Sequence, residues 1–482
     1  MQQRSGLSPR DTPSERRKPG PLGLPRDFWL LWTAAAVSGL GDGLELSAFP
    51  LLASHWTQDP LLVSAAAAAA QAPWLFLGLL VGGLVDRWDR KKVLLIADGC
   101  RALLVMALAV AVALGRGNIW LLLAVLFALG TAQIFFDTSV QAVIPSVVGS
   151  GSLVRANSLL QGSATVLVQF VGPAAGAALF AFAQWLPAGI DAVSYLLGVV
   201  LLAGVRGRFR PRRASSAATT SLRHSVAEGL RWLRGDTVVR VLALATVLLG
   251  MGSAAAWGVM VLFARQQWHL TGAGYGLLLT ASALGSVAGS LVAAPLARRL
   301  PPRLLPVGSA VGSAASFGLL TVSRSAAVAG ALLAVNGLMV VVWNVVTVSE
   351  RQARVPDALT GRVTAAYRVL AWGSMPLGGL VGGALASALG LRSAVLLAAL
   401  LLASAAVLVA VGWGPSASDA GKAAGEAARK ATTTDAEGSA DLQAPLAYGA
   451  HLRSRAGADA RALSRSVTAA PGTLAPAAGG AA

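Results

Sequence analysis

Charged residues are scarce in this sequence of 482 residues, and their scarcity indicates its class. Only 12% of the residues are Asp, Glu, Lys or Arg, whereas soluble proteins carry about 25%. Hydrophobic residues make up 55% and are gathered in long runs, not spaced with the period of an amphipathic helix or strand. These features exclude an ordinary soluble domain and indicate a polytopic membrane protein.

Cysteine and histidine are also rare, with one Cys and four His in the chain. Cys100 can form no intramolecular disulfide, and we expect it to pack as a small apolar residue within its run. The His and Cys residues show no metal-ligand spacing, and no Gly-x-x-x-x-Gly-Lys-Ser/Thr phosphate loop occurs. We therefore expect no metal, no cofactor and no enzymatic activity, with an ion gradient or the substrate gradient as the energy source. Of these, we expect a proton gradient.

Twelve apolar runs are each long enough to cross a bilayer, which requires about 20 residues. They predict helices, because backbone groups in hydrocarbon need hydrogen-bond partners within their own segment, and the short alternating segments of a β-barrel are missing. The predicted spans are residues 28–54, 60–82, 93–114, 119–143, 156–182, 186–205, 238–264, 272–295, 304–323, 326–349, 363–388 and 391–413.

Basic residues predict the orientation, since Lys and Arg in short loops stay in the cytoplasm. The loops on one side carry only Arg116, Arg265, Arg324 and Arg392, and Arg101 lies within a span. The rest of the 39 Lys and Arg fall on the other side with both termini. This asymmetry predicts a multi-pass protein of the cell membrane with cytoplasmic termini. It also accounts for the net charge of +18, and no nucleic-acid partner is expected.

The spans fall into two similar halves joined by a basic connection. Within the connection, Ser225–Arg234 has apolar residues at helical spacing and predicts a short interfacial helix. The bend Gly82–Lys92 has a counterpart at residues 294–303, as in transporters built from parallel repeats. The predicted parts are a cytoplasmic segment (1–27), six-helix bundles (28–205 and 238–413), the cytoplasmic connection (206–237) and a disordered cytoplasmic tail (414–482).

The bend after the second span resembles the loop 2–3 signature of the major facilitator superfamily. That signature usually reads Gly-x-Leu-x-Asp-Arg-x-Gly-Arg-Lys, and Asp89 stands here where the second glycine is usual. The resemblance implies twelve transmembrane helices in two six-helix bundles, with charges of the bend holding the two bundles together in the inward-closed state. The matching residues are Gly82, Leu84, Asp86, Arg87, Arg90 and Lys91.

Further segments are similar to the branch that contains macrolide and siderophore exporters, many of them drug:proton antiporters. Examples are Gly41-Asp42, Gly172-Pro173 and the segment 191–195. The resemblance implies a secondary transporter that exports amphiphilic small molecules by alternating access. A facilitator-type importer or uniporter of a metabolite is the nearest alternative, and a non-transporting receptor or scaffold is a more distant one.

Charged residues inside the spans are functional candidates, because each costs about 2.5–3.5 kcal/mol at a helix centre. Asp42 and Glu45 share one face of the first span near mid-membrane. Two carboxylates at this depth could couple transport to protons or bind a cationic substrate. The alternative is that they are only hydrogen-bonded to water or to neighbouring helices. Asp98, Arg101 and Asp137 lie toward the cytoplasmic part of spans three and four, where we expect them to neutralise one another or to support gating.

Uncharged polar side chains within the spans are candidates for lining a substrate cavity. Helix–helix hydrogen bonds worth about 0.6 kcal/mol are the alternative explanation for each. Asp191, near the outer end of span six, fits a helix-end residue as well as a functional one. We expect the partners to be a small-molecule substrate and the lipid bilayer, with the protein a monomer. The uncharged candidates are Gln71, Gln169, Asn336 and Asn344, with Trp257 and Trp343 as aromatic companions.

Overall fold

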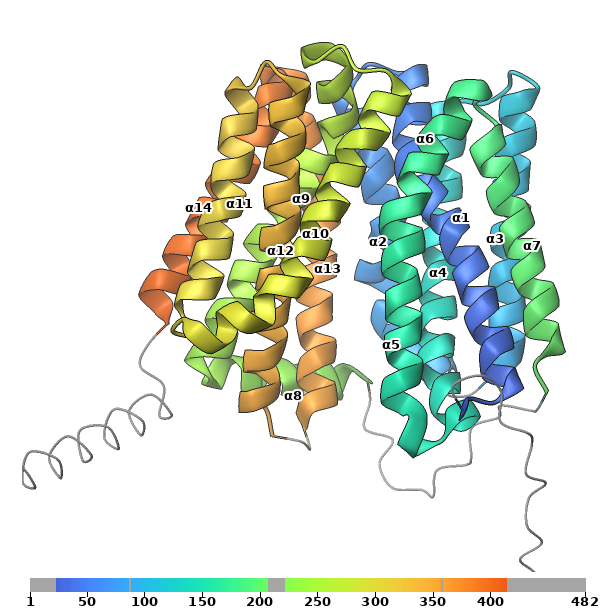
Figure 1. Cartoon of the computed structure of the whole chain (residues 1–482), viewed down its shortest axis with the longest axis horizontal. Coiled ribbons are helices and arrows are strands. Elements are labelled where there is room, and N and C mark those ends of the chain that lie inside the picture. Colours follow the sequence, from blue (N-terminus) through green and yellow to red (C-terminus); the bar gives the residue numbers. More distant parts are fainter. Residues whose placement is uncertain (1–22, 86–87, 207–221, 357–358, 414–482) are drawn as a thin grey trace, which may run out of the picture. The chain divides into compact units, whose positions relative to one another are not determined.

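The computed structural model describes residues 23–85, 88–206, 222–356 and 359–413. The chain divides into two compact units at Gly414, and all described residues belong to the first. Figure 1 shows this unit as helices that run roughly side by side. The helices are α1 (Arg26–Trp56), α2 (Pro60–Val85), α3 (Arg90–Ala113), α4 (Ile119–Val148), η2 (Ser150–Ser152), α5 (Leu153–Ala164), η3 (Thr165–Val171), α6 (Gly172–Phe182), α7 (Leu186–Gly204), α8 (Leu222–Gly235), α9 (Thr237–Gln267), α10 (Gly272–Arg299), α11 (Leu304–Val322), α12 (Ala326–Arg354), α13 (Thr360–Leu389) and α14 (Leu391–Gly412).

Eleven helical segments of the described residues are long and apolar enough to cross a membrane, with Leu153–Phe182 taken as one. α1 is long enough at 31 residues, but Asp42 and Glu45 lower its hydropathy. With α1 packed among the others as the twelfth, the all-α membrane fold predicted from the sequence is confirmed. The predicted helix at Ser225–Arg234 is also present, as α8, and it packs against α13.

Polar side chains fix where several helices begin. Asn118 Oδ1 accepts a hydrogen bond from the Leu121 N–H at the start of α4 (2.9 Å). Asp236 Oδ1 accepts one from the Val239 N–H at the start of α9 (2.8 Å). Such caps satisfy N–H groups that have no partner within the helix. These polar residues also interrupt the apolar runs, and the sequence therefore locates these helix starts closely.

The helices form two halves, α1–α7 and α9–α14, which lie beside each other in Figure 1. Within the halves, α1 packs on α7, α2 on α4, α10 on α12, and α9 on both α13 and α14. The halves meet where α2 packs against α13 and α6 against α10. A Cβ added to Gly383 of α13 would lie only 1.8 Å from Ser64 Oγ of α2. Small residues therefore allow these two helices to approach closely.

Hydrogen bonds join the two halves at the end opposite α8. Ser387 Oγ donates to Asp59 Oδ1 (2.7 Å). Arg265 Nη1 donates to the carbonyl and hydroxyl oxygens of Ser54 (3.2 and 3.1 Å). Two further hydrogen bonds cross between the halves at this end, from the Leu61 N–H to Ser387 Oγ (3.1 Å) and from Gln266 Nε2 to Gln58 Oε1 (3.3 Å).

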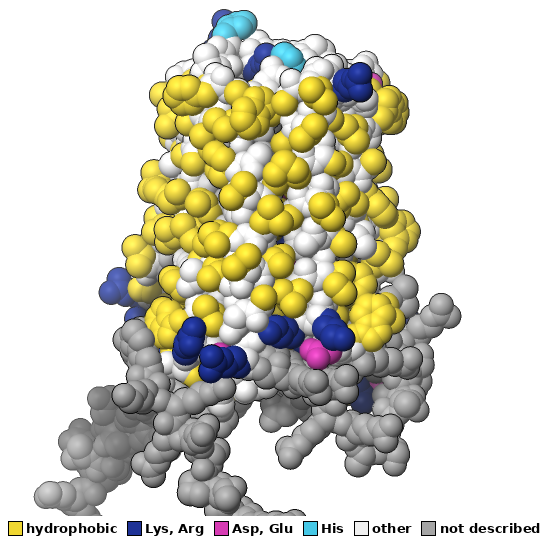
Figure 2. Space-filling view, turned by 90° about the vertical axis from the view of Figure 1, so that its right-hand side faces the viewer, with side chains coloured by type: hydrophobic (Ala, Val, Ile, Leu, Met, Phe, Trp, Pro, Cys, Tyr) yellow, Lys and Arg dark blue, Asp and Glu magenta, His cyan; other side chains and the backbone are white. Residues whose placement is uncertain are grey.

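The surface has the pattern expected of a protein surrounded by lipid. On the face shown in Figure 2, hydrophobic side chains cover the middle and Lys and Arg lie toward the ends, mainly the lower one. Large apolar side chains such as Leu103 (72% exposed) and Phe76 (65% exposed) point outward from the helices. In water such exposure would be costly, whereas hydrocarbon accepts it.

The structure corrects two expectations from the sequence. Cys100 is exposed on α3 and does not pack inside. It shares this outer face with Ile96 and Leu103, each about one helical turn away on either side. The fifth span is not one regular helix, because the π-helical turn Thr165–Val171 separates α5 from α6. Composition does not reveal that turn, since its residues are as apolar as their neighbours.

Candidate functional site

A cavity of about 440 Å³ lies between the two halves. Small and apolar residues of α1, α2, α9, α10 and α13 form most of its wall, with Phe49 and Trp257 as large aromatic side chains. Tyr275 of α10 also faces it. The volume lies within the range of small-molecule sites, about 300–1,000 Å³.

Two carboxyl groups enter the cavity wall from α1. Asp42 and Glu45 both line it, and they are its charged residues among the described lining positions. Their spacing of three residues places them on one helix face, as predicted. The side chain of Asp42 is 26% exposed, so that water in the cavity reaches it.

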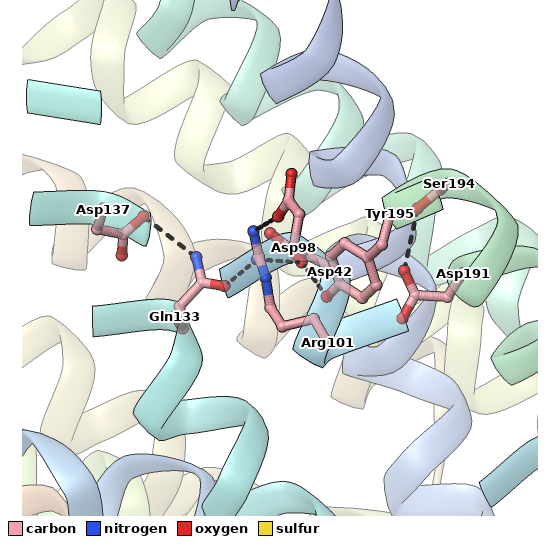
Figure 3. A network of polar contacts seen from close by, with 8 residues as sticks. All are labelled: Asp42, Asp98, Arg101, Gln133, Asp137, Asp191, Ser194 and Tyr195. Carbon is pink, nitrogen blue, oxygen red and sulfur yellow. Dashed lines mark hydrogen bonds and ion pairs between the residues drawn. The ribbon is translucent and has the colours of Figure 1, made fainter. Parts of the chain in front are cut away.

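Arg101 of α3 connects Asp42 to a network buried in the first half (Figure 3). Its guanidinium is fully buried and donates to Asp98 Oδ1 and Gln133 Oε1. Arg101 Nη1 also lies 3.6 Å from Asp42 Oδ1. The guanidinium stacks between two aromatic rings, with its central carbon 4.2 Å from the Phe136 ring and 4.5 Å from the Tyr195 ring. A buried cation needs such partners to offset its lost hydration.

The network extends to α4 and α7, as Figure 3 shows. Gln133 Nε2 donates to Asp137 Oδ1 (3.1 Å), which brings the carboxylate of α4 into the network. The Tyr195 hydroxyl of α7 donates to Asp42 Oδ1 (2.6 Å). The two groups of charges treated separately from the sequence therefore form one continuous network across α1, α3, α4 and α7.

Asp191 of α7 is fully buried behind the cavity wall. Ser194 Oγ donates to its Oδ1 (3.1 Å). The carboxyl group of Asp191 also lies near that of Glu45. A Cβ added to Gly41 would lie 1.8 Å from Asp191 Oδ1, so that the glycine is what allows the acid to lie against α1. The structure thus buries Asp191 against α1, beside the network, whereas the sequence allowed an ordinary helix-end residue equally well.

The uncharged candidates separate into two groups. Gln71 and Gln169 line the cavity, and so does Trp257. Asn336 is buried within the second half and Asn344 is exposed, and neither belongs to the cavity wall. Sequence reasoning did not select Gln133 and Tyr195, because nothing in one helix reveals the partner that another helix brings.

The loop 2–3 motif is described in part. Gly82 lies in α2, whereas Asp86 and Arg87 lie outside the described residues. Arg90 Nη1 donates to the Ala142 carbonyl of α4 (2.9 Å). Lys91 Nζ donates to two carbonyl oxygens at the end of α7, those of residues 203 and 205. These contacts tie α3 to its neighbours in the first half, whereas the sequence suggested a contact between the bundles.

No metal-binding group of three or more His, Cys, Asp or Glu side chains occurs in the described part of the chain. The network instead combines one guanidinium, several carboxyl groups and hydroxyl or amide partners. Such an arrangement can hold, exchange and neutralise protons and charges at the edge of a cavity.

Comparison with known proteins gives consistent matches. The model of the transmembrane secretion effector family matches residues 21–426. An uncharacterised MFS-type transporter of Mycobacterium bovis is 30% identical over 388 residues, 74% of this chain and 85% of the relative. The multidrug efflux pump Tap of Mycolicibacterium fortuitum is 28% identical over 387 residues (77% and 92%). The enterobactin exporter EntS of Citrobacter koseri is 28% identical over 320 residues (64% and 74%).

Solved structures show the same fold. The crystal structure of the nucleoside transporter NupG matches with a TM-score of 0.66 at 11% identity, covering 80% of this chain and 98% of NupG. A bacterial homologue of the iron transporter ferroportin matches with a TM-score of 0.62 at 17% identity (80% and 98%). Together these matches confirm the predicted superfamily and its exporter branch. The chain belongs to the transmembrane secretion effector family of the major facilitator superfamily, whose members are transporters and not enzymes.

Proposed function

We propose that this transporter is a proton-coupled exporter of amphiphilic small molecules that works as a monomer in the cell membrane. The observation that carries the proposal is the cavity between the two halves, whose apolar wall includes two carboxyl groups, one of which, Asp42, belongs to a buried charge network. The efflux function in the names of Tap and EntS supports export as the direction.

The cavity wall indicates the substrate class. Phe49, Trp257 and Tyr275 offer aromatic surface, and Gln71 and Gln169 offer amide groups. Such a wall suits a molecule with a large apolar body and few polar groups. Because the charged lining residues described are acids, a positive charge on the substrate would be favoured over a negative one.

The orientation follows from the distribution of charge. Arg90, Lys91, Arg298 and Arg299 lie at the α8 end, and the positive-inside tendency places that end in the cytoplasm. The hydrogen bonds between the halves lie at the opposite, outer end. In this arrangement the cavity is shut off from the outside and receives substrate from the cytoplasmic side.

Inside-out proteoliposomes test this function with ethidium as an amphiphilic cation. An imposed pH gradient, acidic inside, should drive ethidium accumulation in liposomes that contain the protein. The double variant Asp42→Asn, Glu45→Gln should lose this accumulation, because it removes the carboxyl groups of the cavity. Glu350→Gln is a matched control, since Glu350 pairs with Arg354 outside the cavity. Unchanged accumulation in the double variant would refute the coupling.

A further inference from the structure

We propose that Glu45 and Asp191 share one proton, and that this carboxyl pair is the group that binds and releases the coupled proton. Glu45 stands in the cavity wall and Asp191 is buried behind it. The shared proton is a property of the pair itself, whereas its role in coupling rests on the function proposed above.

Two buried carboxyl oxygens without a donor support a proton between these groups. Glu45 Oε1 and Asp191 Oδ2 are buried and have no donor from the protein. The two carboxyl groups nevertheless lie close enough for a hydrogen bond between them. An ionised carboxylate can only accept hydrogen bonds, so that a bond between two carboxyl groups exists only when one of them carries the proton.

The surroundings keep the pair in this arrangement. Ser194 Oγ donates its hydrogen bond to Asp191 Oδ1, whereas Asp191 Oδ2 has no donor. A protonated Glu45 carboxyl group would supply that donor. Gly41 leaves the space that Asp191 and Ser194 fill between α1 and α7. Asp191 is therefore held toward α1, and Glu45 connects it to the water of the cavity.

Neighbouring charges distinguish this pair from Asp42. Asp42 accepts from the Tyr195 hydroxyl and faces the Arg101 guanidinium, and its negative charge is thereby balanced. Asp42, Arg101 and Tyr195 also lie near the pair. The Arg101 guanidinium already interacts with Asp98, Gln133 and Asp42. Asp137 is hydrogen-bonded to Gln133 and not to the pair. Two ionised carboxylates in contact would repel strongly in this medium, and one proton removes that repulsion.

Substrate and proton then compete for the same place. When a cationic substrate approaches Glu45, the O–H bond of the pair breaks and the proton passes to water in the cavity. When a proton returns from the opposite side, the net charge of the pair falls from two negative units to one, and its attraction for the cation weakens. One proton therefore moves inward for each turnover that carries a cation outward.

Infrared difference spectroscopy of the purified full-length protein tests the shared proton without transport. The C=O band of a protonated carboxyl group should be present at neutral pH and lost as the pH is raised. It should be absent at neutral pH from Glu45→Gln and from Asp191→Asn, and it should persist in Asp42→Asn. The exchange variant Glu45→Asp, Asp191→Glu keeps two carboxyl groups and should keep the band, which excludes misfolding as the cause of its loss.

Proton release on ethidium binding, measured with a pH indicator in weak buffer, tests the coupling role. The wild type should release a proton and Glu45→Gln should release none. A neutral-pH band that is missing from the wild type, or that survives both single substitutions, would overturn the shared proton. If the band is normal and the pH gradient drives ethidium transport, but ethidium binding releases no proton, then the pair shares a proton without coupling it to transport. That result would overturn only the coupling role of the pair. A normal band without any gradient-driven transport would refute the function proposed above and leave the pair intact.

Discussion

Arg101 is the residue on which the buried network of the first half depends. Its side chain is fully buried and joins carboxyl groups from α1 and α3 to the amide of Gln133. Breaking a buried ion pair by removing one partner costs about 3–5 kcal/mol, because the other charge stays buried without compensation. Asp98, which is also fully buried, would be left in that position.

Arg101→Leu should therefore destabilise the protein by about 3–5 kcal/mol, seen as a lower melting temperature of the purified protein in detergent. Arg116→Leu is the control, because Arg116 is exposed beyond the end of α3. Adding Asp98→Asn to Arg101→Leu should restore part of the loss, since it removes the uncompensated charge. Equal melting temperatures for Arg101→Leu and Arg116→Leu would show that the network carries little stability.

Several site residues could be identified from the sequence because each is unusual where it stands. Asp42, Glu45, Asp98 and Arg101 interrupt apolar runs, and all four belong to the network or the cavity wall. Asn344 interrupts a run in the same way, yet it is exposed. A polar residue within a span is thus visible in the sequence, but the side of the helix that faces the cavity is decided by packing.

The packing of α1 on α7 creates the acid pair. Gly41 is the point of closest approach, where an added Cβ would lie 1.8 Å from Asp191 Oδ1 and 2.4 Å from Ser194 Oγ. Residues 41 and 191 are far apart in the sequence, so the sequence does not reveal that they are in contact. Without that contact, the position of Asp191 near the end of a span is also consistent with an ordinary helix-end residue. The contact arises from the tertiary fold alone.

Gly41→Ala should push α7 away from α1 and separate Asp191 from Glu45, because the new methyl group overlaps the carboxylate. We expect at least about a tenfold loss of gradient-driven ethidium accumulation, comparable to removing a positioned catalytic or coupling group. Gly99→Ala is the matched control, since nothing lies within 4 Å of a Cβ added to that helical glycine. Accumulation that falls equally in both variants would contradict the assigned role of Gly41.

The fifth span shows what sequence patterns miss within an element. Its π turn, Thr165–Val171, adjoins a place where α1 and α6 cross at their backbones, since a Cβ added to Gly172 would lie 2.4 Å from the Gly43 Cα. Gln169 of the turn faces the cavity. π turns are frequent at functional sites, and here hydrophobicity gave no indication of the change in helix type.

The assembly of the halves was predictable in outline. Apolar runs bounded by charges gave the helices, and the motif at Gly82–Lys91 gave the superfamily. Contacts between the halves could not be predicted, because they depend on which helices meet. Ser387 and Asp59 meet between the halves at the end opposite α8, although neither has an unusual sequence context.

In the alternating-access cycle proposed here, the contacts between the halves at the end opposite α8 open once per cycle. Oxidation of the variant Asp59→Cys, Ser387→Cys in a Cys100→Ala background should therefore join the halves and stop transport, and a thiol reductant should restore it. The two original side chains are hydrogen-bonded at 2.7 Å, which makes the new thiols near neighbours. Each single cysteine variant serves as a control and should be insensitive to oxidation. Full transport by the cross-linked protein would refute an outer opening at this place.

The acid pair and its network belong to the first half, whereas the second half contributes uncharged surface to the cavity, including Trp257, Tyr275 and Met375. In the proposed cycle the proton chemistry belongs to the first half, whereas both halves contribute surface to substrate recognition. Substitutions in α9, α10 and α13 can change the range of accepted compounds while the proton chemistry stays intact. A family built on this plan can acquire new specificities through one half at little risk to the driving force.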